Sequence, residues 1–150
     1  MIILTNQLTK SPAEIIESAL VAHLQAQTEL TGVNIERGIE TDVTVLPLCV
    51  VSVSSLNPIS DVPEGQGHFN ATLSVTVFTS SDEATALTVH RARTAAVLGA
   101  LQDIPAIKAL FTSQADATCY DVIYTSTEES QGDRTLLSTS NYSILIVLPA

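Results

Sequence analysis

The chain has 150 residues, of which 45% are hydrophobic and 15% are charged. This length and composition predict one folded domain over residues 1–150 and exclude a largely disordered chain. The formal net charge is −10, from 16 acidic and 6 basic residues. Because affinity for a phosphate backbone comes largely from Lys and Arg, this balance argues against sequence-specific nucleic-acid binding.

Two cysteines and the start of the chain bear on its compartment. Cys49 and Cys119 lie in apolar, strand-like runs. Two isolated cysteines do not make the disulfide framework of a small secreted protein, so we expect two buried thiols in a reducing compartment, with a single bridge left open. Residues 1–6 lack the basic and long apolar regions of a signal peptide. No stretch approaches the ~20 apolar residues of a membrane span, so we expect no membrane partner.

The first predicted element is a helix from Ser11 to about Gln27. Ser11-Pro12-Ala13-Glu14 is a capping box with proline at the first helical position. Apolar residues then recur at helical spacing and form one stripe that predicts a core face: Ile15, Ile16, Ala19, Leu20, His23 and Leu24. Because His23 lies on this stripe, we interpret it as a core histidine rather than a metal ligand.

A hairpin is predicted next. Residues 33–37 form an optional short strand that ends at Gly38, and residues 43–53 form an apolar strand covered on both faces in its middle. Pro47 lacks a backbone donor and indicates a bulge or an edge there. Residues 54–68 are rich in Pro, Gly and Ser and predict a long connection. Residues 69–79 alternate apolar and polar side chains, which is typical of a half-buried antiparallel strand.

A second helix is predicted from the capping box Ser80-Ser-Asp-Glu83 to about Leu101. Its inward side is expected to consist of Leu87, Thr94, Val97, Leu98 and Leu101. His90, Arg91 and Arg93 are interpreted as a solvated or interface stripe. Residues 103–111 predict a short extra helix that begins at Pro105.

The last predicted element is a second hairpin. In its first arm, residues 117–127, the side chains of Tyr120, Val122 and Tyr124 alternate with Cys119, Asp121 and Ile123. Residues 128–133 form a polar tip, and residues 134–148 form the second arm, with one apolar side of Tyr142, Ile144, Ile146 and Leu148. The predicted fold is therefore α+β: two antiparallel hairpins form a mostly antiparallel sheet, and two main helices pack on one face.

Known catalytic patterns are missing from the sequence. It has no Gly-rich phosphate loop before a helix and no Gly-x-Ser-x-Gly elbow. The histidines and cysteines lack metal-ligand spacing, and Glu64 and His68 are four residues apart only within a Gly-rich loop. Glu128, Glu129 and Asp133 lie on a predicted solvated tip, unlike a buried acid pair. We predict no catalytic, cofactor-binding or metal residues and no cofactor, although serine is too abundant to exclude a nucleophile by counting.

Surfaces are the better candidates for function. Ser and Thr fill the predicted polar strand faces, which suits a sheet face that is wet or meets another subunit. These residues are Ser52, Ser54, Thr72, Ser74, Thr76, Ser138 and Ser140. The residues that we predict to make interactions are Leu56, Asn57, Glu64, His68, Arg91, Arg93, Glu128, Glu129 and Asp133.

The order of these elements resembles phage tail-terminator or tail-completion proteins. The likeness covers most of the chain and is architectural. It comprises the helix at 11–27, the apolar strand with its long loop, the strand at 69–79, the second helix with its segment 90–101, a small helix, and a C-terminal hairpin. That hairpin contains Tyr120-Asp-Val-Ile-Tyr124 and Tyr142-Ser-Ile-Leu-Ile-Val147. The polar hairpin tip and the long first loop depart from the family pattern.

The resemblance implies a structural virion protein that is not an enzyme. Such proteins form a homo-hexameric ring that caps the tail tube, ends its polymerisation and joins the tail to the head connector. DNA passes the lumen without specific binding, and an acidic wall is compatible with that passage. The implied location is the tail or neck of the virion, after assembly in the host cytoplasm. By analogy, residues 56–68 and 128–133 would project toward the tube protein, the connector or stopper protein, or the lumen.

Two other readings stay open. The chain could be another head–tail connector subunit, such as a stopper or completion protein. It could also be a small α+β enzyme or ligand-binding domain, which predicts a pocket of ~300 Å³ or more with converging polar groups. A ring subunit predicts instead large flat contacts well above ~1,000 Å² per neighbouring pair.

Overall fold

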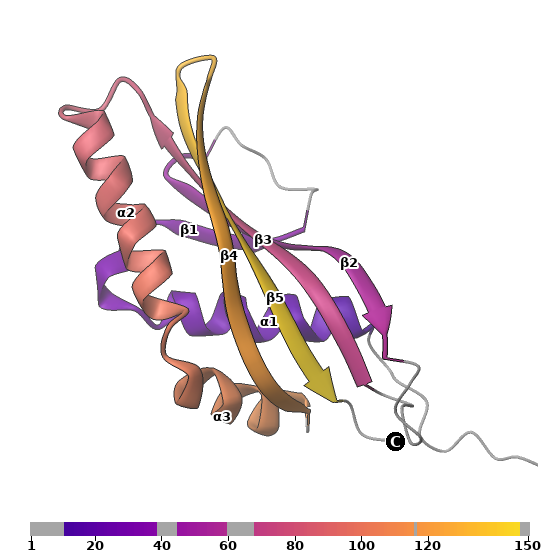
Figure 1. Ribbon diagram of the computed structural model, residues 1–150. Coiled ribbons are helices and arrows are strands. Elements are labelled where there is room, and N and C mark those ends of the chain that lie inside the picture. Colours follow the sequence, from indigo (N-terminus) through magenta and orange to yellow (C-terminus); the bar gives the residue numbers. More distant parts are fainter. Residues whose placement is uncertain (1–10, 39–44, 60–67, 116, 148–150) are drawn as a thin grey trace, which may run out of the picture.

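The structure is a computed structural model that describes residues 11–38, 45–59, 68–115 and 117–147 (Figure 1). Its elements, in chain order, are helix α1 (Pro12–Gln25), the 3-10 turn η1 (Thr28–Leu30), strands β1 (Asn34–Arg37), β2 (Leu48–Pro58) and β3 (His68–Ser80), helices α2 (Ala86–Ala100) and α3 (Ile104–Ala115), and strands β4 (Thr118–Gly132) and β5 (Thr135–Val147). Glu64 and Leu148, which the predictions above include, lie outside the described residues.

The five strands form one sheet in the order β1-β2-β3-β5-β4. β1 pairs in parallel with β2, and every other neighbouring pair is antiparallel. The predicted α+β class is confirmed, with both hairpins present. The optional short strand predicted at residues 33–37 is present as β1 and forms one edge of the sheet. A third helix, α3, is present in addition to the two main helices.

The helices cover one face of the sheet, and α1 crosses behind the strands in the view of Figure 1. α1 contacts β1, β2 and α3, α2 contacts β3 and β5, and α3 contacts β4. Alternate residues of β3 and β5 face these helices and are buried: Ala71, Leu73, Val75, Val77, Tyr142, Ile144 and Ile146. Burial of each large aliphatic side chain stabilises the fold by about 1.5–3 kcal/mol, so this layer is the core.

Helix α1 forms as its sequence predicts. The backbone N–H of Glu14 donates to the Ser11 hydroxyl at 3.0 Å, and Pro12 occupies the first helical position. The buried residues of α1 are the six of the predicted stripe. His23 is 3% exposed, and its Nε2 lies 2.7 Å from the carbonyl oxygen of Ala100. The prediction of a satisfied core histidine is therefore confirmed.

The start predicted for the second helix is wrong. α2 begins at Ala86, and its N-cap Thr85 has the left-handed φ of 52° without a side-chain capping bond. The Ser80 hydroxyl instead accepts from the backbone N–H of Asp82. The predicted inward face is also wrong: Leu87, predicted inward, is 49% exposed, and His90, predicted outward, is 1% exposed. The side chain of His90 can face the core because both of its ring nitrogens have hydrogen-bond partners there.

The alternation predicted for the second hairpin is also wrong at one point. The pairing of β4 with β5 shifts register between Cys119 and Asp121 and again between Tyr124 and Ser126. The first bulge adds Tyr120 and puts Cys119 and Val122 on the same buried face, while Tyr120 is 53% exposed. A bulge inserts one unpaired residue, which reverses the alternation that a regular strand would keep.

Both hairpins are longer than predicted. β2 begins at Leu48 rather than at residue 43, directly after Pro47, and continues through Pro58. β4 continues to Gly132, so the residues predicted as a polar tip mostly form strand, and the turn narrows to Asp133 and Arg134. Cross-strand pairing overrides the local turn preference of these polar residues. The two cysteines are buried and free, as expected.

Candidate interaction surfaces

The residues predicted to interact lie at opposite ends of the sheet. At one end of β3, His68 pairs with Val147; at the other end, Ser80 pairs with Thr135. β3 has 13 residues and therefore spans about 40 Å. Leu56, Asn57 and His68 lie at the first end, on β2 and β3. The acidic residues Glu128, Glu129 and Asp133 lie on the second hairpin, toward the other end. The structure thus separates these residues into two groups.

The second group includes an ion pair between α2 and β4. Arg91 donates from Nε and Nη2 to the two carboxylate oxygens of Glu129, both at 3.1 Å. The side chains of Arg91 and Glu129 are 60% and 44% exposed. The hydrogen bond from Arg91 lowers the pKa of Glu129. Arg91 and Glu129 were predicted separately as interaction residues, and the fold brings them together on the flank of the second hairpin.

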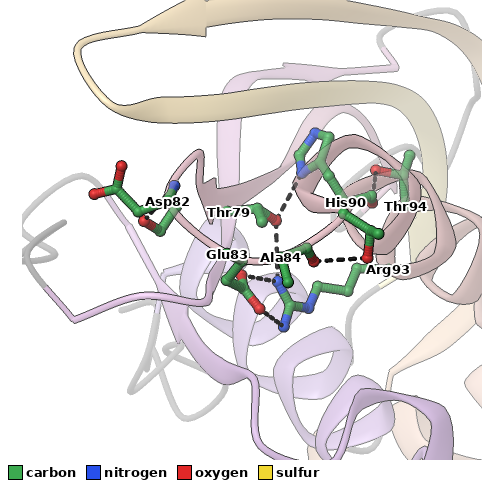
Figure 2. Close-up of polar contacts among 9 residues, drawn as sticks. Thr79, Asp82, Glu83, Ala84, His90, Arg93 and Thr94 are labelled. Carbon is green, nitrogen blue, oxygen red and sulfur yellow. Dashed lines mark hydrogen bonds and ion pairs between the residues drawn. The ribbon is translucent and has the colours of Figure 1, made fainter.

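Arg93 points to the start of α2 instead (Figure 2). Its Nη1 donates to Glu83 at 2.8 Å and to the Thr79 hydroxyl at 3.3 Å, and its Nη2 donates to the other oxygen of Glu83 at 3.2 Å. The hydrogen bond from Arg93 is the main reason that the pKa of Glu83 is lowered. Because Arg93 is only 17% exposed, it stabilises the turn before α2 and offers little surface to a partner.

The imidazole of His90 lies beneath this turn (Figure 2). Its Nδ1 lies 2.8 Å from the Thr79 hydroxyl, and its Nε2 lies 2.7 Å from the Ser138 hydroxyl. Burial is the main cause of its lowered pKa, and Arg93 and Arg91 act in the same direction, against Glu129 and the backbone of Leu137. His90 therefore ties α2 to β3 and β5 as a neutral imidazole at neutral pH.

A hydroxyl beside an imidazole resembles part of a nucleophile triad, but here the Thr79 hydroxyl stands where a triad has a carboxylate. Ser138 and Thr79 are both fully buried, and His90 is 1% exposed. A nucleophile must reach its substrate, and here the helix layer covers the Ser138 oxygen. The arrangement therefore acts as a structural cross-link. Within the described ranges, no cluster of three or more His, Cys, Asp or Glu residues could hold a metal ion.

The sheet face opposite the helices, which we call the open face, is uncharged in its centre. β2, β3 and β5 contain no Asp, Glu, Lys or Arg. Polar side chains cross-link the strands on this face: the Ser74 hydroxyl donates to Asn141 at 2.9 Å, the Thr76 and Thr139 hydroxyls lie 3.2 Å apart, and the Ser143 hydroxyl donates to Asn70 at 2.8 Å. In a chain of net charge −10, this is a broad surface without like-charge repulsion.

A recess of about 290 Å³ opens between the α2–α3 corner and β4. We call it the β4 recess. It is lined by Leu98, Leu101, Gln102, Ile104, Val122, Tyr124 and Tyr142. The Tyr124 and Tyr142 rings meet edge to face with centroids 5.6 Å apart. The sequence did not reveal the recess, because its residues come from four elements that only the fold assembles. The volume is near that expected of a ligand site, and the lining is mainly apolar, with polar groups only on Gln102, Tyr124 and Tyr142.

No single described helix is long and apolar enough to cross a membrane, and α2 with α3 reaches that length only as a pair bent by 68°.

Comparison with known proteins finds similarity at the level of fold. No protein-family model matches the sequence, and neither does any curated protein. Among solved structures, the chain is similar to one from the virion of a native gene transfer agent particle. The superposition has a TM-score of 0.58 at 13% identity and covers 87% of this chain and 93% of that chain. At this identity the likeness shows a shared fold over nearly the whole length.

Proposed function

We propose that this protein is a structural virion subunit and, more specifically, a tail terminator. In this proposal six copies form a ring that caps the tail tube, ends tube polymerisation and joins the tail to the head connector. The protein acts without catalysis or cofactor, assembles in the host cytoplasm and stays in the neck of the virion.

The shared fold carries the proposal. The similar chain belongs to a gene transfer agent virion and matches over 93% of its own length. A match over nearly the whole of both chains supports a building block of a particle better than a domain of a larger enzyme. The order of elements, which resembles tail terminators, narrows this support to the junction of head and tail.

The two ends of the sheet support a subunit with two different partners. The first end carries Leu56, Asn57 and His68. The other end carries the acidic residues of the second hairpin. A terminator must contact the tube on one side and the head connector on the other. Two surfaces of different composition, separated by about 40 Å, suit two separate contacts.

The charge distribution supports passage of DNA. Lys and Arg number only 6 of 150 residues, and three of the arginines are paired with Glu14, Glu129 and Glu83. Phosphates release counterions only where basic side chains neutralise them. A ring built from such subunits therefore lets DNA slide through without binding it.

The first experiment is to measure the mass of the purified protein by light scattering over a concentration series, alone and with purified tail tubes. The proposal expects a hexamer in solution, or a monomer that forms rings on tube ends visible by electron microscopy, together with tubes of limited length. A protein that stays monomeric and leaves tube growth unchanged contradicts it. If rings bind isolated connectors but not tubes, the chain is a stopper-type connector subunit instead.

A charge-reversal experiment tests whether the flank of the second hairpin is a contact between subunits. Arg91→Glu breaks the exposed pair with Glu129, and Arg91→Glu combined with Glu129→Arg restores it. If this flank of the second hairpin is an assembly surface, ring formation falls in both variants, because each changes the charge pattern that a neighbour meets. Unchanged assembly in both excludes this stripe as an interface. Recovery in the double variant alone shows that the pair acts only within the subunit.

A further inference from the structure

The β4 recess lies beside a free sheet edge. Among the described strands, β4 pairs only with β5, so the outer backbone groups of β4 face no described strand. Of the five large hydrophobic side chains exposed among the described residues, three lie here: Tyr120, Ile123 and Tyr124, each at least half exposed. An unpaired edge next to exposed apolar side chains is a template for an added strand.

The recess also contains a polar group without a partner. The Tyr142 residue is 3% exposed, and its hydroxyl oxygen has no hydrogen-bond partner among the described residues. Tyr142 lines the recess beside the half-exposed Tyr124. A buried hydroxyl normally finds a partner, and an unsatisfied one is costly. The fold therefore leaves one polar group unsatisfied in a side chain that lines the recess.

The geometry of β4 limits the size of this occupant. The bulges at Tyr120 and Thr125 interrupt pairing on either side, which leaves Asp121 to Tyr124 as the regular stretch. A recess of about 290 Å³ holds one or two large aliphatic side chains. The best occupant is a short extended segment with consecutive aliphatic residues. It should be uncharged, since the recess lining contains no charged side chain.

One part of the chain has this chemistry. Residues 1–9, Met-Ile-Ile-Leu-Thr-Asn-Gln-Leu-Thr, contain no charged residue and have three consecutive aliphatic side chains at Ile2, Ile3 and Leu4. Isoleucine and threonine favour strands. The segments 39–44 and 60–67 contain two acidic residues each and do not match the uncharged recess.

We propose that residues 1–9 of a second copy dock at the β4 recess, where the alternate side chains of Ile2 and Leu4 fill the recess and the backbone of this segment pairs with Asp121 to Tyr124. The inference rests on the proposed ring, because a segment exchanged between neighbours would link its subunits. It goes beyond the ring in naming the segment and its receptor. A contact of one surface with a different surface of the next copy is heterologous, which is the type that closes rings.

The position of α1 favours a second copy over the same one. The carboxylate of Glu17 on α1 accepts from the backbone N–H of Val53 at 2.8 Å, so α1 starts beside β2. β2 and β4 are separated by β3 and β5, and α3 packs between α1 and β4. A segment that leaves Ser11 would have to pass around α3 to reach its own recess.

The first test is binding of a labelled peptide of residues 1–9 to a full-length receiver that carries Ile2→Ser, Ile3→Ser and Leu4→Ser. We expect saturable binding, followed by fluorescence anisotropy. Tyr124→Ser in the receiver should weaken it at least about tenfold, because this ring lines the recess. Leu87→Ser is the matched control: Leu87 is 49% exposed and Tyr124 is 50%, but Leu87 lies in the first turn of α2 and not in the lining of the recess. Equal affinity for all receivers, or no binding, overturns the proposal.

The second test shows whether residues 1–9 dock on their own chain or on a second copy. A chain with Leu4→Cys is mixed with a differently tagged chain with Tyr124→Cys under mild oxidation. The native Cys49 and Cys119 are buried and serve as the internal background. Cross-links between the two tags are the expected result. If cross-links form only within a chain that carries both substitutions, the segment binds its own recess and the exchange is wrong.

The same variants separate this inference from the ring itself. If the receiver with three serine substitutions still forms hexamers on tubes and does not bind the peptide, the docking is wrong and the ring stands. If peptide and cross-links behave as expected but only dimers or open chains form, the docking stands and the hexameric terminator is wrong.

Discussion

The Nε2 atom of His90 lies 2.7 Å from the hydroxyl oxygen of Ser138, so a side chain of α2 is joined to β5 near the turn of the second hairpin. Both residues are almost fully buried. This bond, with its counterpart to Thr79, satisfies the polar end of an otherwise aliphatic core.

Replacement of His90 should be costly. His90→Ala leaves a cavity and two buried hydroxyls without their partner, so the free energy of unfolding should fall by about 2–4 kcal/mol. Urea denaturation followed by circular dichroism measures the loss. Arg91→Ala, one residue along the helix and exposed, is the control and should leave the urea midpoint nearly unchanged. Equal midpoints for both variants would show that the imidazole is not a structural cross-link.

Stability should depend on pH through the same residue. Burial lowers the pKa of His90 below its usual 6.5, so the unfolded chain binds this proton more readily than the folded one. The contribution of neutral His90 to the free energy of unfolding is fully present above about pH 6.5. It is lost as the pH falls through the lowered pKa of His90. The thermal midpoint of the wild type should therefore drop as the pH falls below about 6.5.

A variant isolates this effect. His90→Gln keeps a donor and an acceptor but cannot be charged, so its thermal midpoint should change less over this range. The lowered pKa of Glu83 acts in a separate window, because its usual value is 4.5 and its stabilising effect is lost only below that pH. Parallel curves for wild type and His90→Gln would assign the pH dependence to other groups.

The backbone before α2 offers a stabilising substitution. Thr85 has a φ of 52°, a left-handed conformation that is unfavourable for a β-branched residue. Its side chain makes no capping bond to the helix. Thr85→Gly should therefore raise the free energy of unfolding by about 0.5–1 kcal/mol, measured by urea denaturation. Thr85→Ala retains the Cβ strain and should bring no such gain; a gain in both would point to the side chain rather than the backbone.

The Tyr142 hydroxyl should be dispensable for folding. Burial raises its pKa strongly, and the group has no hydrogen-bond partner among the described residues. Tyr142→Phe keeps the ring and removes the unsatisfied group, so the isolated subunit should be as stable or up to about 1 kcal/mol more stable in urea. A loss above that size would reveal a partner for the hydroxyl in the isolated subunit.

The two thiols should react slowly in the folded protein. Burial raises the pKa of Cys49 to about 12 and that of Cys119 to about 11, and a thiolate is the reactive form. With a chromogenic disulfide reagent at pH 8, we expect little reaction before denaturant is added and release of two equivalents after. Rapid labelling of Cys49 in native buffer would contradict its burial.

Local chemistry was enough to predict several elements from the sequence. α1 carries its cap, its proline and its apolar stripe within fourteen residues, so no distant contact is needed to define it. The alternation of β3 likewise defined a half-buried strand, because one face of a sheet must meet the core and the other must not. These two patterns, together with the second hairpin, determined the α+β class.

The tertiary structure decided what depends on contacts between distant residues. The sequence did not show that His90 faces inward, because Thr79 and Ser138, which satisfy it, lie 11 and 48 residues away. It did not show the bulges in β4, which the register with β5 imposes, and it did not show the β4 recess. Periodicity records only which residues share a face. Which polar groups are satisfied in the core, and which edge stays open, depends on the partners that folding brings together.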